Sequence, residues 1–279
     1  MTTAALSAPD SLPAVRAPHR DMVVSSVRLE LASFFRVKDQ VVFTFVFPVL
    51  LLVIFATVFG DETAGEVPFV QYFLPGMVAS GLMLVTFQNL AITIAMERTD
   101  GTLKRLAGTP MPPVVYFAGK VGVVLVVGVA QQLLLLSVAA TVYGVPLPTA
   151  PQRWVTFAWV ALLGVTAGGL AGVAFSSVPR TGKSASAVVT PIVLLLQFSS
   201  GVFFAIQDIP PWLRRVAELF PLKWVAQGMR SVFLPDSYIT YEPAGSWQHP
   251  TMAAVLVAWC VLGLVLCART FRWVQRDDG

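Results

Sequence analysis

Six long apolar runs constrain this chain more than any other feature. They cover residues 41–59, 72–96, 114–143, 154–178, 185–206 and 251–268. Each is close to the roughly 20 residues that a helix needs to cross the hydrocarbon core of a bilayer. Lys120, near the start of the third run, is the only charged residue inside them. Because lipid offers no hydrogen-bond partners, an open chain crosses it only as helices. We therefore predict an all-α integral membrane protein with six transmembrane helices.

Composition and the N-terminal region fit that class. The chain is 56% hydrophobic and 12% charged, about half the charge of a soluble domain. Residues 1–20 are rich in Ala, Pro and Ser and lack the apolar core of a secretory signal, so we expect a disordered cytoplasmic tail. Residues 21–279 then form a single transmembrane domain. Residues 22–38 carry an apolar stripe at helical spacing, which is typical of a helix lying in the membrane interface. The alternative is a helix packed on protein.

The distribution of basic residues predicts the orientation. Of the 19 Lys and Arg residues, 14 fall on the side that holds both termini, and the loop over residues 60–71 has acids but no base. Since Lys and Arg favour cytoplasmic loops, both termini and the loop after the second run are predicted to be cytoplasmic.

That loop, residues 97–113, is the most charged connection between two spans. Asp100 and Thr102 are candidate N-caps of a short helix, on which Leu103 and Leu106 share one face. Pro residues at 110, 112 and 113 end that helix. Two interpretations remain at this point: a solvated loop, or a docking element for a soluble partner.

Polar and small residues inside the runs give further expectations. Gly164, Gly168 and Gly172 form a small-residue ridge that suits either intramolecular packing or a dimer seam. The runs contain no acid, whereas a proton- or sodium-coupled carrier usually needs one. Amides and aromatic rings are left to form a substrate path. The candidates are Phe87, Gln88, Asn89, Gln197, Phe198 and Phe203.

Two further stretches need an interpretation. The segment over residues 207–250 is too long for an idle loop. Two short amphipathic helices separated by proline predict a re-entrant hairpin on the outer side, or a pair lying flat on the membrane. Its marker residues are Pro211, Trp212, Pro221 and Arg230.

Residues 177–184 almost spell a phosphate loop, but Ser177 replaces its first glycine and Pro179 removes an amide. We therefore expect no nucleotide site here, and no Cys or His spacing indicates a metal.

These pieces resemble the membrane subunit of a type-2 ABC exporter. The motif E-R-x-x-G-T-L-x-R-L-x-x-T-P at residues 97–110 is similar to the coupling-helix signature of that family, and residues 220–230 resemble its second signature. The resemblance covers about residues 20–276, and the Ala- and Pro-rich tail makes the chain similar to the daunorubicin-type drug exporter group. Many members have an acid where Lys104 stands, so the charge partner on the ATPase differs here.

The resemblance implies a division of labour between subunits. ATP and Mg would bind two copies of a separate ABC ATPase, and this permease would bind no cofactor itself. It would pair with a second permease copy or a related permease in the bacterial cytoplasmic (inner) membrane, contacting lipid and no nucleic acid. The coupling residues implied by the motif are Glu97, Arg98, Gly101, Leu103, Lys104, Arg105 and Leu106. In this picture the leucines fill a groove of the ATPase and the charged residues pair around its rim.

The cargo implied is an amphipathic drug-like molecule or a lipid, exported from the cell. One alternative is a polysaccharide or glycolipid exporter permease, which shares the architecture. Alternatives of another class are a lipid-modifying enzyme, for which Asp61, Glu62 and Glu66 are the nearest acids, and a membrane scaffold. We expect no catalysis by this chain.

Overall fold

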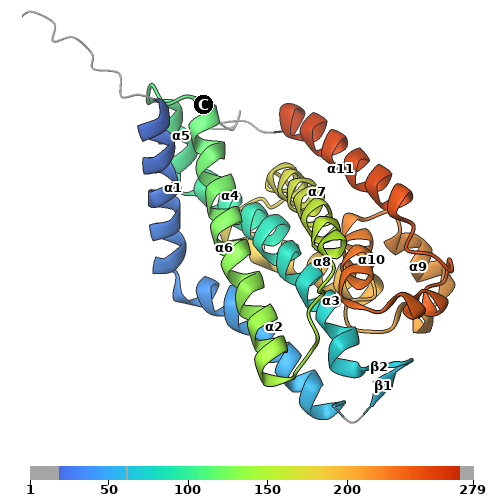
Figure 1. The fold of residues 1–279 in the computed structure, drawn as a ribbon. Helices are drawn as coiled ribbons and strands as arrows, with labels where there is room; N and C mark the ends of the chain where they lie inside the picture. Colours follow the sequence, from blue (N-terminus) through green and yellow to red (C-terminus); the bar gives the residue numbers. More distant parts are fainter. Residues whose placement is uncertain (1–18, 61, 271–279) are drawn as a thin grey trace, which may run out of the picture.

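The computed structural model describes residues 19–60 and 62–270 and is almost entirely helical (Figure 1). Its α-helices are α1 (His19–Arg36), α2 (Lys38–Val58), α3 (Phe69–Met83), α4 (Asn89–Thr99), α5 (Thr102–Ala107), α6 (Pro113–Val142), α7 (Pro151–Phe175), α8 (Gly182–Ser199), α9 (Pro211–Ala217), α10 (Pro221–Phe233) and α11 (His249–Thr270). A π-helical turn, η1 (Leu84–Gln88), joins α3 to α4, and 3-10 turns cover Ile206–Asp208 and Asp236–Tyr241. Strands β1 (Thr63–Ala64) and β2 (Val67–Pro68) form a small antiparallel hairpin.

Six stretches of the described chain are long and apolar enough to cross a membrane, as predicted. They are α2, the continuous stretch α3–η1–α4, α6, α7, α8 and α11. The predicted boundaries hold within a few residues except at the fifth. That helix was expected to continue to Ile206, but α8 ends at Ser199. Gly201 adopts a φ of 73°, a left-handed conformation that a helix cannot continue through. The residues after it are apolar but form an irregular segment.

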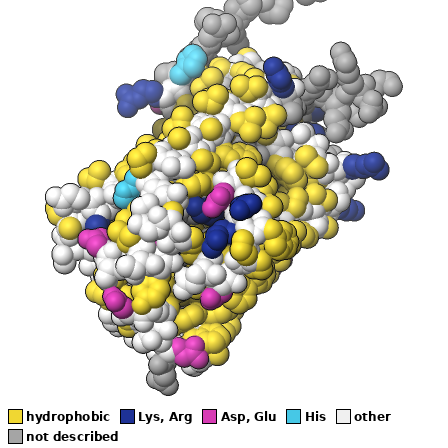
Figure 2. Space-filling view, turned by 90° about the vertical axis from the view of Figure 1, so that its right-hand side faces the viewer, with side chains coloured by type: hydrophobic (Ala, Val, Ile, Leu, Met, Phe, Trp, Pro, Cys, Tyr) yellow, Lys and Arg dark blue, Asp and Glu magenta, His cyan; other side chains and the backbone are white. Residues whose placement is uncertain are grey.

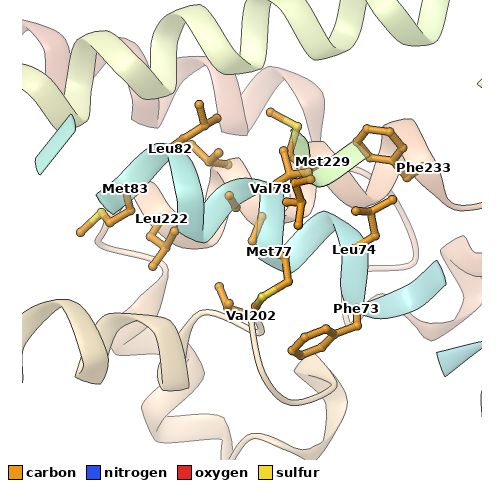
Figure 3. Close-up of a cluster of buried hydrophobic side chains, with 14 of the residues drawn as sticks. Phe73, Leu74, Met77, Val78, Leu82, Met83, Val202, Leu222, Met229 and Phe233 are labelled. Atoms are coloured by element: carbon orange, nitrogen blue, oxygen red, sulfur yellow. The ribbon is translucent and has the colours of Figure 1, made fainter. Parts of the chain in front are cut away.

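The second span lies at the centre of the domain. Every residue of α3 from Tyr72 to Met83 is buried, which is unusual for a helix that could cross a membrane. Its side chains meet α10 and the irregular segment after α8 (Figure 3). The contacting side chains from those two elements include Leu222, Met229, Phe233 and Val202. The outer helices α2 and α11 have the two smallest buried shares of these six stretches, with 22% and 17% of their apolar windows buried, as suits helices in contact with lipid.

The glycine ridge of α7 packs inside this chain. A Cβ at Gly164 would come within 2.7 Å of Val225 on α10, one at Gly168 within 2.5 Å of the Thr86 hydroxyl, and one at Gly172 within 2.7 Å of the Phe87 carbonyl oxygen. The last two contacts lie on the π-helical turn. Of the two interpretations of the ridge, the structure supports intramolecular packing.

The N-terminal helix packs along the beginning of α6. A Cβ at Gly122 would come within 2.5 Å of Val27, and Phe34 of α1 is buried in a cluster with Tyr116 and Val123 of α6. The side of α1 that carries Val27 and Phe34 therefore faces protein. The position of α1 relative to a lipid surface stays a prediction.

The hairpin after α8 has one inserted helix and one exposed helix. All residues of α10 are buried in the protein. Whether the pair re-enters the membrane or lies flat on it stays a prediction. Trp212 of α9 is 67% exposed. Figure 2 shows the side of the molecule that carries α9, where hydrophobic side chains form broad areas and a group of charged side chains lies near the middle. The burial of α10 and the exposure of Trp212 on α9 suit a helix pair that enters the domain from its surface.

Candidate functional site

The short helix α5 forms as predicted, but with different ends. Gly101 occupies the N-cap position with a φ of 72°, and no side chain caps the helix. The prediction that Asp100 or Thr102 is the N-cap is therefore wrong, since Asp100 ends α4 instead. Helix α5 stops at Ala107, and Pro113 begins α6. A glycine is needed at position 101 because the chain reverses there through a left-handed residue.

The two leucines of α5 face inward. Leu103 is 1% exposed and belongs to a buried cluster with Phe34, Ile94 and Tyr116, while Leu106 is half-buried against the same cluster. The expectation that Leu103 fills a groove of a partner is thus corrected, because its side chain already lies in the core of this chain. The exposed surface of α5 carries Lys104 and Arg105. A partner that touches α5 would meet this cationic rim.

Arg98 and Thr99 tie the end of α4 to the connection between α7 and α8. One terminal nitrogen of Arg98 donates to the Ser176 carbonyl oxygen at 2.6 Å and the other to the Ser176 hydroxyl at 3.2 Å. The Gly182 amide donates to the Thr99 hydroxyl at 2.7 Å. Arg98 therefore ties the end of α4, next to α5, to the connection between α7 and α8, instead of standing free as a rim residue.

Glu97 belongs to a charged network that joins three helices. Lys120 of α6 is buried and forms ion pairs with Glu30 of α1, at 2.8 Å, and with Glu97 of α4. The Tyr116 hydroxyl donates to Glu97 at 2.7 Å. Burial raises the pKa of Glu30 above its ordinary value, and Lys120 opposes that shift. One cation thus holds two carboxylates from different helices beside α5.

The sequence that resembled a phosphate loop is the start of a helix. Thr181 accepts a hydrogen bond from the Ser184 amide at 3.2 Å, and the Ser184 hydroxyl accepts one from the Thr181 amide at 3.2 Å. This reciprocal capping box begins α8. The Gly-Lys-Ser sequence therefore has a structural explanation in these residues.

A cavity of about 850 Å³ lies between α1, α2, α4, α6 and α8. Its volume is that of a site for a drug-sized molecule. Charged side chains line it near α5 and at the start of α2, and the rest of the lining consists of amides, hydroxyls, aromatic rings and aliphatic groups. The charged lining residues are Glu30, Asp39, Glu97, Asp100 and Lys120.

The cavity brings together three of the six residues expected to form a substrate path. Gln88, Asn89 and Gln197 line it. The three aromatic candidates lie elsewhere. Phe87 is buried against Phe175, Phe203 packs against other rings of the core, and Phe198 is exposed on α8.

The sequence analysis missed the part of the cavity that precedes the first apolar run. Gln40 donates a hydrogen bond to the side-chain oxygen of Asn89, which also accepts one from Thr93 at 3.0 Å. Asp39, the residue before Gln40, also lines the cavity. Both residues belong to α2, which begins at Lys38, three residues before the predicted start. A polar pair directly before an apolar run was the available signal.

The four marker residues of the hairpin have distinct positions. Pro211 and Pro221 are first residues of α9 and α10, where a missing amide costs nothing. Arg230 is buried and its Nε donates to Glu242, itself buried, at 2.6 Å. Burial alone would lower the pKa of Arg230, but the Glu242 carboxylate raises it above its ordinary value. This ion pair fixes α10 against the segment that precedes α11.

Comparison with known proteins gives consistent relatives. Residues 23–234 match the model of a protein family described as ABC-2 type transporter. The chain is 25% identical over 258 residues to the inner membrane transport permease YadH of Escherichia coli strain K12, covering 90% of this chain and 93% of the relative. It is 24% identical over 170 residues to the E. coli K12 protein named "Probable multidrug ABC transporter permease YbhR", covering 60% of this chain and 44% of the relative. The family match runs from α1 into the segment after α10 and includes α5 and the cavity.

Proposed function

The chain belongs to the ABC-2 type transporter family, and on that premise we propose that it is the permease subunit of an ATP-driven exporter. It moves an amphipathic, drug-like or lipid molecule out across the bacterial cytoplasmic membrane. Two copies of a separate ABC ATPase supply the energy, and a second permease copy or a related permease completes the path. The multi-pass helical architecture and the similarity to an inner membrane transport permease support this assignment.

The observation that carries the proposal is the direct connection between α5 and the cavity. Asp100 lines the cavity and is followed at once by Gly101 and α5. Leu103 transfers any displacement of α5 into the cluster shared by α1, α4 and α6. Those three helices also form walls of the cavity. A force on the exposed rim of α5 would therefore act on the cavity through packed side chains.

The size of the cavity favours a small cargo over a polymer. Sites for drug-sized ligands have volumes of about 300–1,000 Å³, and this cavity of about 850 Å³ falls within that range. The name of the E. coli K12 relative, "Probable multidrug ABC transporter permease YbhR", supports the same class of cargo.

The test is co-purification of an ATPase through the cationic rim of α5. The tagged chain is expressed with its native ATPase subunit, extracted in mild detergent and assayed for bound ATPase. We expect the double charge reversal Lys104→Glu with Arg105→Glu to remove most of the bound ATPase while membrane insertion is unchanged. The matched control is Arg214→Glu with Arg215→Glu on α9, on the other side of the molecule (Figure 1). Equal ATPase recovery from both double variants would refute docking at α5.

A further inference from the structure

The cavity has an excess of negative charge in a chain that is positive overall. The protein carries a formal net charge of +4. The cavity, in contrast, is lined by four carboxylates and one ammonium group, and Lys120 is the only basic residue among the described residues that line it. Its lining therefore has the opposite sign to the whole molecule.

The single cation is already neutralised. Lys120 forms ion pairs with both Glu30 and Glu97, so this trio alone retains one negative charge. Asp39 and Asp100 are exposed and also line the cavity, at the start of α2 and the end of α4. Because unlike charges within a few ångströms attract, this lining favours a positively charged group. An anionic group there would be repelled.

The lining changes character along the helices. From Asp100 to Leu84 the cavity wall follows about 24 Å of the second span, at 1.5 Å per residue. On this span Asp100 and Glu97 give way to Thr93 and Asn89 and then to Leu84. On α2, Asp39 is likewise followed by the apolar Phe43 and Phe47. A molecule that matches this gradient has a charged head and an apolar body.

A buried hydrogen-bond acceptor lies in the wall on α8. Gln197 is 1% exposed, and its side-chain oxygen has no hydrogen-bond partner among the described residues. It stands 15 residues after Gly182, the first residue of α8, which contacts Met96, the residue before Glu97. A buried acceptor without a partner is costly. A ligand that brings an N–H or O–H group to this wall would satisfy it.

We infer that the cavity selects cationic amphiphiles: the positive head lies beside the carboxylates of the lining, which include Glu97, Asp39 and Asp100, and a hydrogen-bond donor on the body meets Gln197. This inference rests on the proposed function, because it names the class of molecule that the exporter would carry. It is independent of how the ATPase docks.

The experiment measures binding without any ATPase. The purified chain is placed in nanodiscs of a neutral phosphatidylcholine, with empty nanodiscs as the blank. Three dansyl probes share a sulfonamide N–H and an alkyl chain and differ in the terminal group: an ammonium, a methyl or a carboxylate. Dansyl fluorescence reports transfer into an apolar site. We expect the ammonium probe to bind about tenfold more tightly than the carboxylate probe, with a difference that shrinks as salt is raised.

The variants locate the site. Asp39→Asn with Asp100→Asn should weaken the ammonium probe about fivefold and leave the methyl probe unchanged. Gln197→Leu should weaken all three probes by a similar factor, about fivefold. Asp21→Asn with Glu66→Gln is the matched control, since it removes two exposed carboxylates that do not line the cavity. It should change nothing.

The outcomes separate this inference from the proposed function. Equal affinity for the three probes, or equal effects of the two double variants, would overturn the inference even if an ATPase co-purifies. Selective binding of the ammonium probe by a chain that recovers no ATPase would support the cavity assignment and count against the exporter. Loss of the ammonium preference in only the cavity variant supports the inference directly.

Discussion

At the residue scale, three glycines decide how closely α7 packs against its neighbours. The ridge of Gly164, Gly168 and Gly172 is visible in the sequence, and it correctly indicates close helix packing. Its partners are not visible, because two of the glycines meet a single π-helical turn of five residues, which is too short to show a period in the sequence. Only the structure shows that two of these glycines face Thr86 and Phe87.

Two glycines on this helix make a matched pair for a stability measurement. A methyl group at Gly172 would lie 2.7 Å from the Phe87 carbonyl oxygen and 3.0 Å from its Cα, whereas one at Gly169 would lie 3.6 Å from a Leu90 methyl group. Backbone cannot move aside cheaply, so Gly172→Ala should destabilise the protein by about 2 kcal/mol. Gly169→Ala should be neutral or slightly stabilising, because Ala is the better helix former. Apparent melting temperatures in one detergent compare them. Equal effects would contradict the packing described here.

A second prediction concerns the pH dependence contributed by Lys223 on α10. Its ammonium group donates to Gln227 at 2.8 Å and lies 3.6 Å from the centre of the Trp224 ring. Burial lowers the pKa of Lys223 from 10.5 to about 8. Between these two values the unfolded chain binds more protons than the folded protein, so stability should rise with pH. Below about pH 8 the lysine is charged in both states and the contribution is constant.

The measurement compares the native protein with Lys223→Met from pH 7.5 to 10.5. The native protein should gain stability relative to the variant by about 2 kcal/mol across this range. The difference between the two proteins isolates this lysine from every other titrating group. A constant difference would mean that Lys223 titrates normally in the folded state.

At the scale of elements, the ion network on Lys120 could not be predicted from the sequence. The lysine is visible as the only charge in an apolar run, but its partners lie 90 and 23 residues away along the chain. The pairing depends on how α1 and α4 pack against α6. The fifth span shows the same limit, because the residues after Gly201 are apolar enough to suggest helix yet pack as an irregular segment. Hydropathy reports burial, and burial does not require a helix.

Replacing Lys120 should weaken the packing of α1 and α4 against α6, because Lys120 pairs with a carboxylate from each. Lys120→Met leaves Glu30 and Glu97 near one another without a counter-charge, and breaking a buried ion pair in this way costs about 3 kcal/mol. A second change, Glu30→Gln, should restore part of the loss because one carboxylate is then removed. Thermal unfolding of the single and double variants measures both effects. A double variant less stable than the single one would show that the network does not act as a unit.

At the scale of the whole molecule, the helical class and the number of apolar spans were predicted from the sequence, whereas the cavity was only half predicted. Three amide residues on two spans line it, but its carboxylates come from α1, α2 and the end of α4, which no local pattern connects. The start of α1, α5 and the end of α11 lie at the same end of the helical bundle (Figure 1). That arrangement agrees with the charge distribution, and the orientation itself stays a prediction.

Cysteine labelling tests the orientation. With Cys260 and Cys267 replaced by alanine, single cysteines are placed at two exposed positions, Ala107 at the end of α5 and Ala244 before α11. A membrane-impermeant maleimide added to spheroplasts should label Ala244→Cys and spare Ala107→Cys. Permeabilised cells should show labelling at both. The reverse pattern in intact spheroplasts would place α5 outside and exclude docking to a cytoplasmic ATPase.

The π-helical turn adds one residue to the second span compared with a regular α-helix. Such a turn spans i to i+5 instead of i to i+4, so Leu84–Gln88 stores one residue more than an α-helix of the same length would need. If the turn relaxed to α-helical geometry, α4 would rotate by about 100° and shift by about 1.5 Å along the helix axis relative to α3. The polar residues of α4 would then turn away from the cavity while α3 stayed fixed in the core. In this geometry a small displacement of α5 along the axis of α4 would be coupled to a rotation of α4, which forms one wall of the cavity.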